Sequence, residues 1–191
     1  MGQVPVLVPR AEQLHDHPER AERADQGIEA DANYATGGLS LTAAGAYTDA
    51  KTRNDLCATQ VCSGDGTDVL APKGTRLPIT PRFKASGTAR YSMPIGAAKA
   101  YIQGLVAHQS SAAADIRLEQ AASFGRLKAY TTANASVGAE LSNFTFELFV
   151  QNLWDERAQL SRFQQCGTCS QRTYIVTSTP RTIGLRAGAK F

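Results

Sequence analysis

Apolar and polar residues alternate with a period of two along most of the chain, and the last eleven residues show this most clearly. One series is Ile183, Leu185, Ala187, Ala189 and Phe191, and the other is Thr182, Gly184, Arg186, Gly188 and Lys190. Successive side chains of a β-strand point to opposite faces, so this pattern predicts a strand with one apolar face and one small, polar or cationic face. Its length matches the roughly 9–11 residues that a tilted strand needs to cross a bilayer.

The same alternation recurs in six earlier stretches, so the pattern predicts seven strands. They are expected at residues 27–34, 39–50, 81–91, 98–109, 125–141, 144–154 and 181–191. Tyr101 and Leu105 break the alternation in the fourth stretch, which leaves the faces of that strand unassigned. On the regular strands one face is free of charge, and Arg and Lys fall on the other.

Short and long connections alternate strictly between these strands. The short ones are residues 36–38, 93–96 and 142–143, and the long ones are 51–80, 110–124 and 155–180. Outer-membrane barrels join their strands in this way, with tight periplasmic turns and extended outer loops. We therefore predict an all-β fold, an antiparallel up-and-down transmembrane β-barrel segment with its carboxyl terminus on the periplasmic side.

Composition and charge agree with a membrane barrel and exclude other classes. Charged residues make up 19% of the chain, below the quarter or so of a typical soluble domain. A net charge of +3, without basic clusters interleaved with aromatics, gives no indication of a nucleic-acid partner. No apolar run approaches the length of a transmembrane helix. A charge facing lipid at mid-depth costs roughly 2–4 kcal/mol, so we expect the charged face to line the lumen.

The amino-terminal residues 1–26 lack this alternation and are expected to form a non-barrel tail, either disordered or a short surface helix. They also lack the basic region, apolar run and cleavage site of a signal peptide. We accordingly expect the cell outer membrane as the location if the chain is exported. His15 and His17 lie in this tail and are expected to be a surface tract rather than a metal site.

Four cysteines form two local pairs in the long connections, Cys57 with Cys62 and Cys166 with Cys169. Four cysteines could bind zinc, and a C-x-x-C pair could be a redox motif. Because these connections are predicted to lie outside the cell, where disulfides persist, we expect two disulfides that staple the loops. Local pairing is one of three possible connectivities.

No catalytic, cofactor or metal site is expected from the remaining polar residues. His108, Ser110 and Asp115 lie near one another in sequence but lack a nucleophile elbow and an oxyanion site. The adjacent carboxylates Asp155 and Glu156 lack a pocket for acid–base chemistry. We therefore expect a protein that is not an enzyme.

Several segments in the right order resemble TonB-dependent outer-membrane receptors, over residues 27–191. These are residues 27–34, residues 77–83, the motif Asn152, Leu153, Trp154 and Asp155, and the close at 180–184 with Lys190 and Phe191. The match fits the carboxyl-terminal third of the family's barrel. Ala158 departs from the family, which usually has an aromatic residue after this motif, and we expect an altered interface anchor there.

The resemblance implies a barrel of about 22 strands, plugged by an amino-terminal domain. Such receptors take up ferric siderophores, cobalamin or sugars with energy from an inner-membrane complex. Seven strands cannot close a barrel of that width, so we expect a fragment that arose from a truncated gene, a mis-called start or a partial sequence. We expect it not to transport alone, and only the full-length receptor to engage the TonB complex.

The resemblance also assigns roles to single residues. Phe191 looks like the terminal aromatic that the barrel-assembly machinery reads, and Tyr91, Phe144 and Trp154 fit interface girdles next to outer-membrane lipid. Lumen cations outnumber lumen acids and are expected to pair with a plug or with one another, or to contact an anionic small-molecule ligand. The cations are Arg82, Lys84, Arg90, Lys128, Arg186 and Lys190, and the acids are Glu29, Asp31, Glu140 and Glu147.

Two other structures fit parts of the pattern. In a small stand-alone outer-membrane barrel or adhesin, residues 1–26 or 155–180 would supply an eighth strand. A soluble β-sandwich would also show alternation, but it gives no reason for all long loops to lie at one end.

Overall fold

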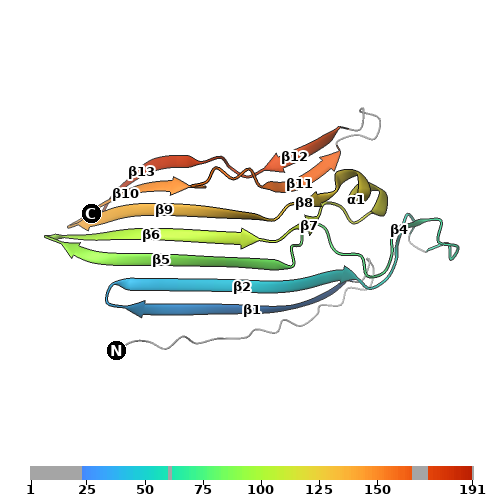
Figure 1. Ribbon diagram of the computed structural model, residues 1–191, viewed down its shortest axis with the longest axis horizontal. Coiled ribbons are helices and arrows are strands. Elements are labelled where there is room, and N and C mark those ends of the chain that lie inside the picture. Colours follow the sequence, from blue (N-terminus) through green and yellow to red (C-terminus); the bar gives the residue numbers. More distant parts are fainter. Residues whose placement is uncertain (1–22, 60–61, 165–171, 191) are drawn as a thin grey trace.

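A single seven-stranded antiparallel sheet dominates the chain (Figure 1). The computed structural model describes residues 23–59, 62–164 and 172–190. The strand order in the sheet is β1-β2-β5-β6-β9-β10-β13, so consecutive strands of the sheet are neighbours. Their bounds are β1 Arg23–Thr36, β2 Leu39–Thr52, β5 Phe83–Ile95, β6 Ala98–Gln109, β9 Tyr130–Leu141, β10 Phe144–Gln151 and β13 Thr182–Ala189. The predicted all-β, up-and-down arrangement of seven strands is confirmed.

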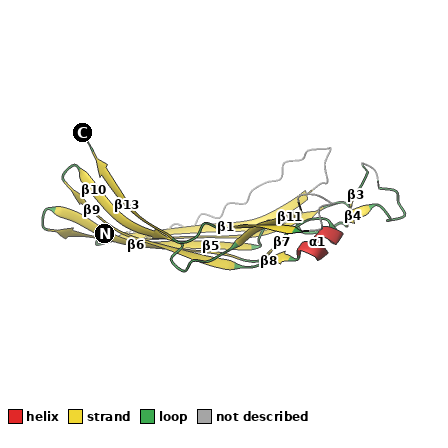
Figure 2. Cartoon of the chain, turned by 90° about the horizontal axis from the view of Figure 1, so that it is seen from above, coloured by secondary structure: helices red, strands yellow, loops and turns green. Residues whose placement is uncertain are grey.

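The sheet is open in the part of the chain that is described. β1 and β13 are its two edges, and no pairing joins them within residues 23–59, 62–164 and 172–190. Figure 2 shows that the sheet is bent rather than flat. A bent, open, antiparallel sheet is the shape expected for one sector of a barrel wall.

The long connections carry small structures of their own, and Figure 1 shows them gathered at the end of the sheet opposite the short turns. The first holds β3 (Leu56–Cys57) and β4 (Val69–Ala71), and the second holds β7 (Ala112–Ala113), α1 (Leu118–Phe124) and β8 (Arg126–Leu127). The third holds β11 (Gln159–Gln164) and β12 (Thr173–Thr177), which pair with each other as a separate hairpin.

Several predicted boundaries are corrected. β1 begins at Arg23, within the expected tail, because its backbone pairing with β2 continues to Thr52. The turn predicted at 93–96 is shorter, since β5 pairs with β6 as far as Ile95. The strand predicted over 125–141 is broken between β8 and β9, because β8 pairs with β7 instead of extending the main sheet.

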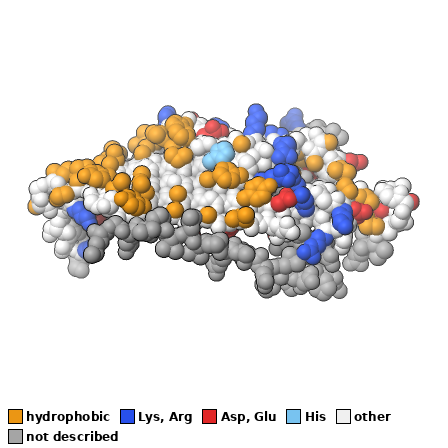
Figure 3. Space-filling view, turned by 60° about the horizontal axis from the view of Figure 1, so that its bottom comes forward, with side chains coloured by type: hydrophobic (Ala, Val, Ile, Leu, Met, Phe, Trp, Pro, Cys, Tyr) orange, Lys and Arg blue, Asp and Glu red, His pale blue; other side chains and the backbone are white. Residues whose placement is uncertain are grey.

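The register places the apolar series of all seven strands on one face. Residues that are directly opposed in a ladder share a face of the sheet. One unbroken row of opposed residues crosses the sheet through Thr36, Leu39, Tyr91, Ile102, Val137, Leu148 and Leu185. Most of these side chains are exposed, with Ile102 at 57% and Leu185 at 84%. Figure 3 shows hydrophobic side chains gathered over this surface, which we call the apolar face.

The sheet has almost no protein core to cover the apolar face. The buried hydrophobic cluster of the described residues consists of Ala112, Ala114, Phe124 and Leu127, which belong to the second long connection. A contiguous exposed apolar surface of this kind is typical of contact with lipid or another apolar partner. No helix in the described ranges is long and apolar enough to cross a membrane.

A charge placed on the apolar face should therefore weaken folding in a bilayer much more than the same charge on the opposite face. We expect Val137→Arg to lower the free energy of unfolding in phospholipid vesicles by about 2–4 kcal/mol, because the guanidinium would face hydrocarbon. Ser136→Arg, the next residue of β9 but on the other face, should cost less than about 1 kcal/mol. Urea titration of both variants measures the difference. Equal losses would contradict the assignment of faces.

Candidate functional site: the polar face and its outer corner

Four directly opposed residues form a row across the polar face of the last strands. Tyr101, Gly138, Glu147 and Arg186 lie opposite one another on β6, β9, β10 and β13. The Tyr101 hydroxyl donates a hydrogen bond to Glu147 Oε2, on the strand beyond Gly138. Arg186 Nη1 lies 2.6 Å from Glu147 Oε1. One carboxylate thus connects the side chains of three strands.

Two arginines extend this row through aromatic rings. The Arg90 guanidinium lies 3.6 Å from the centre of the Tyr101 ring and donates a 3.3 Å hydrogen bond to Gln103. Arg186 lies 5.2 Å from the centre of the Phe149 ring. Cations over aromatic faces are attracted by the ring quadrupole, so both arginines are held in place. We call Arg90, Tyr101, Glu147, Phe149 and Arg186 the lumen network.

Glycines make room for the two rings of the lumen network. A Cβ added at Gly138 would lie 2.5 Å from the Tyr101 ring, and one added at Gly184 would lie 2.5 Å from the Phe149 ring. Aromatic side chains that cover cross-strand glycines restore the packing that glycine lacks and fix the register. Tyr101 breaks the sequence alternation because its ring belongs over Gly138 on the polar face. The alternation alone missed this pairing, although Tyr101 and Gly138 fall directly opposite once the register is known.

Closer to the long connections, the polar face has a hollow of about 810 Å³. Its floor consists of small residues, including Ala44, Ala46 and Ser86, and its rim carries Glu29, Asp31, Lys84 and Tyr130. The structure thus brings together three of the predicted lumen charges. With two carboxylates and one ammonium at its rim, the hollow suits a polar or charged group.

Asn152 makes the corner at which the chain leaves β10. Its backbone N–H donates to Asn134 Oδ1 at 2.9 Å, and its side-chain oxygen accepts from the N–H of Glu156 at 2.9 Å. Its side-chain nitrogen donates to the carbonyl oxygens of Glu156 and Thr179, both at 2.9 Å. The residue is buried at 7% exposure and has a φ of 52°. Asparagine is one of the few residues that adopt this left-handed conformation readily, so both its backbone and its amide suit the corner.

Asp155 joins the two ends of the third long connection. Its carboxylate accepts a 2.8 Å hydrogen bond from the N–H of Arg181 and lies 3.3 Å from Arg157 Nη2. The bond from Arg181, helped by the charge of Arg157, lowers the pKa of this carboxyl. Ala158 is buried at 2% exposure, and its N–H donates to Ser178 Oγ. A small residue therefore fits this position inside the corner.

Sequence comparison identifies the chain at this point. The sequence profile of the family described as "TonB dependent receptor-like, beta-barrel" matches residues 25–153, more than half of the chain. The chain belongs to this family. The predicted resemblance to TonB-dependent receptors is confirmed, and so is the location in the cell outer membrane that the family implies.

Solved structures show the same fold. The ferric yersiniabactin uptake receptor FyuA from Yersinia pestis is similar with a TM-score of 0.68 and 18% identity, over 88% of this chain and 24% of that one. The ferric preacinetobactin receptor BauA from Acinetobacter baumannii has a TM-score of 0.65 and 14% identity, over 88% of this chain and 22% of that one. The ferric citrate transporter FecA has a TM-score of 0.61 and 21% identity, over 88% of this chain and 24% of that one. The chain spans about a quarter of their length. A comparison with curated protein sequences gave no match.

The disulfide prediction for this TonB-dependent receptor chain is confirmed for its first pair. Cys57 and Cys62 are bonded, with their Cα atoms 5.4 Å apart, so a zinc site at this pair is wrong. In the same connection Asp65 accepts hydrogen bonds from the Ser63 hydroxyl and from Thr67, which lower its pKa to about 2. Cys166, Cys169, Phe191, His15 and His17 lie outside the described residues, and their predicted roles stay predictions.

The remaining residues that the sequence singled out do not come together in one site. His108 Nδ1 lies 2.8 Å from Thr131 Oγ1, and Asp115 binds Arg117, so His108, Ser110 and Asp115 form no relay. Arg82, which directly precedes β5, lies 3.4 Å from Asp49, and its predicted place in the lumen stays a prediction. The motif residues Leu153 and Trp154 are exposed at 41% and 57%, next to the buried Asn152.

Enlarging Gly138 should break the lumen network. We expect Gly138→Val to displace the Tyr101 ring and to lower the free energy of unfolding in vesicles by about 1–3 kcal/mol through overpacking. Gly104→Val is the matched control, because a Cβ at Gly104 meets nothing within 4 Å. The double variant Gly138→Val with Tyr101→Ala should recover part of the loss. A Gly104 variant as unstable as the Gly138 variant would contradict this account.

Removing the amide of Asn152 should loosen the whole corner. We expect Asn152→Ala to cost about 2–4 kcal/mol, because buried backbone groups of Glu156 and Thr179 lose their partners. Asn152→Gly should lower the free energy of unfolding nearly as much. Glycine adopts the φ of 52° without strain, but it also lacks the amide. Urea unfolding and the rate of protease cleavage within residues 155–180 measure the effect. Gln151→Ala, at an exposed neighbour, is the control, and an equally small effect for all three variants would refute the role of the amide.

Proposed function

We propose that the chain forms one sector of the wall of an outer-membrane receptor that takes up a ferric chelate with energy from the TonB complex. The observation that carries this proposal is the register, which gives a member of this family one apolar and one polar face across all seven strands. The apolar face contacts outer-membrane lipid, and the polar face lines the lumen through which the ligand passes.

The receptors of similar fold support a ferric chelate as the ligand class. The sequence resemblance allowed ferric siderophores, cobalamin or carbohydrates. The matched structures are described as receptors or transporters for ferric yersiniabactin, ferric preacinetobactin and ferric citrate. The two arginines of the lumen network outnumber its one carboxylate, which favours an anionic ligand such as a ferric chelate.

The remaining partners belong to assembly and energy supply. We assign Phe191 to recognition by the barrel-assembly machinery, and contact with the TonB complex to the full-length receptor. A stand-alone barrel or adhesin would need an eighth strand from residues 155–180 or from the amino-terminal stretch. In the described part of residues 155–180, β11 and β12 pair with each other and not with the main sheet, which argues against the first of these sources.

A labelling experiment in cells that make the full-length receptor tests the proposal. Lys84→Cys places a thiol at the rim of the polar hollow, and Tyr91→Cys places one on the apolar face of the same strand, away from the hollow. A bulky water-soluble maleimide should lower the uptake of radiolabelled ferric chelate severalfold in the first variant and leave the second unchanged. Collapse of the proton gradient should abolish uptake in both. Uptake that resists both treatments would overturn the proposal.

A further inference from the structure

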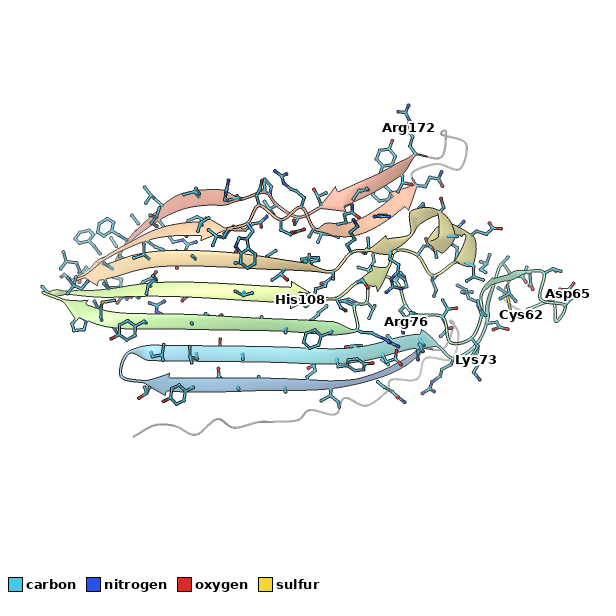
Figure 4. The ribbon with its side chains drawn as sticks, in the orientation of Figure 1. Cys62, Asp65, Lys73, Arg76, His108 and Arg172 are labelled. Atoms are coloured by element: carbon cyan, nitrogen blue, oxygen red, sulfur yellow. A yellow bond between two sulfur atoms is a disulfide. The ribbon has the colours of Figure 1, made fainter. Side chains whose placement is uncertain are left out.

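Basic side chains border the apolar face at the end of the long connections. Asp49 and Lys51 continue the series of β2 residues that includes Tyr47, so both lie on the apolar face beyond the last aromatic. Lys51 pairs with Arg76 in an antiparallel bridge, which brings Arg76 to the same place. Figure 3 shows Lys and Arg side chains gathered beside this end of the hydrophobic surface, and Figure 4 shows Arg76 close to the end of β2.

These residues leave an excess of positive charge. Lys51 Nζ lies 2.7 Å from Asp49 Oδ2, and Arg82 Nη2 lies 3.4 Å from Asp49 Oδ1. The side chains of Lys51 and Arg82 are 38% and 39% exposed, so they can also reach a ligand. Arg76, the bridge partner of Lys51, adds a third cation, so three cations accompany one carboxylate here. We call Asp49, Lys51, Arg76 and Arg82 the rim cluster.

Below the rim cluster the apolar face offers a shallow path for a chain. The aromatic side chains of Tyr47 and Phe83 lie directly opposite each other and are exposed at 47% and 45%. Beyond them lies a hollow of about 720 Å³ whose lining is almost entirely apolar. Small residues form much of it, and larger side chains lie at its edges. The small residues are Ala32, Ala43, Gly87, Ala89 and Gly104, and the larger ones include Tyr34, Leu41 and Val106.

The dimensions of this path match one leaflet of a bilayer. From Phe83 to Ala89 the strand advances by six residues, roughly 20 Å at about 3.3 Å per residue. Half of a hydrocarbon core of about 30 Å is roughly 15 Å, and a tilted strand needs more length than that to cross it. The rim cluster therefore lies at the level of the headgroups when the hollow lies in hydrocarbon.

We propose that the rim cluster and the hollow form a binding site for a lipid with a phosphate-bearing headgroup in the outer leaflet. Arg76, Arg82 and Lys51 hold the phosphate, and an acyl chain lies along Tyr47 and Phe83 into the hollow. Arginine matches phosphate geometry, and basic residues beside a transmembrane segment attract anionic headgroups. The site rests on the proposed function, because it requires the apolar face to lie in lipid.

Fluorescence quenching of the full chain in phosphatidylcholine vesicles tests the site. The chain has a single tryptophan, so Trp154→Phe with Phe83→Trp places one reporter between the rim cluster and the hollow. The vesicles carry the same mole fraction of either acyl-brominated phosphatidic acid or acyl-brominated phosphatidylcholine. We expect the phosphatidic acid to quench the reporter at a severalfold lower mole fraction.

Removing cations should remove this preference in steps. We expect Arg76→Gln and Lys51→Gln each to lower the preference for phosphatidic acid about fivefold, as expected for one basic residue at a membrane surface. Lys128→Gln, an exposed cation outside the cluster, should leave it unchanged. Unchanged quenching by brominated phosphatidylcholine in every variant shows that the chain is still inserted.

The possible outcomes separate the site from the function on which it rests. Equal quenching by the two lipids, or a preference that survives both substitutions, would overturn the lipid site and leave the barrel assignment intact. Loss of the preference in millimolar inorganic phosphate would assign the cluster to free phosphate instead of a lipid. An absence of quenching by either lipid would contradict both the lipid site and the assignment of the apolar face to the membrane.

Discussion

Hydrocarbon offers no partner for a backbone N–H or C=O, and the structure depends on this constraint. Each unpaired group costs several kcal/mol in a membrane, so a spanning segment must pair its whole backbone within the protein. The five inner strands do this, because each pairs with a neighbour on both sides in an unbroken series of antiparallel ladders, whereas the edge strands β1 and β13 pair on one side only within the described residues. Because those ladders also fix which side chains share a face, the same pairing that satisfies the backbone separates lipid contacts from lumen contacts.

The two faces are stabilised by different interactions. On the apolar face large side chains such as Ile102 and Leu185 contact no protein core, and their favourable environment has to be supplied by lipid. On the polar face Glu147 connects Tyr101 and Arg186 across three strands, and Gly138 provides the space for this. Ion pairs on exposed surfaces contribute little to stability. This network also holds aromatic rings over glycines of the neighbouring strands, and that packing fixes the register between the strands.

Alternation was sufficient to predict the fold but not the contacts within it. Period-two patterns identified all seven strands of the sheet and the side on which the long connections lie. They stopped four residues short of the start of β1, because Gln26 interrupts the apolar series whereas its backbone still pairs with Asp49. They could not assign Tyr101 to the polar face, because its position depends on Gly138, the opposed residue on β9, and alternation within one strand carries no information about the neighbouring strand. The hydrogen bonds of Asn152 depend on a φ of 52° and on Thr179, far away in sequence.

Accessibility of spin labels along β10 tests the central claim most directly, because this strand pairs on both sides. Labels at Phe144, Phe146, Leu148 and Val150 should collide with dissolved oxygen, which concentrates in lipid. Labels at Thr145, Glu147, Phe149 and Gln151 should respond instead to a water-soluble nickel complex. The account predicts a strict period of two across these eight positions when the chain is in bilayers. Accessibility that does not alternate, or that alternates in the opposite phase, would contradict it.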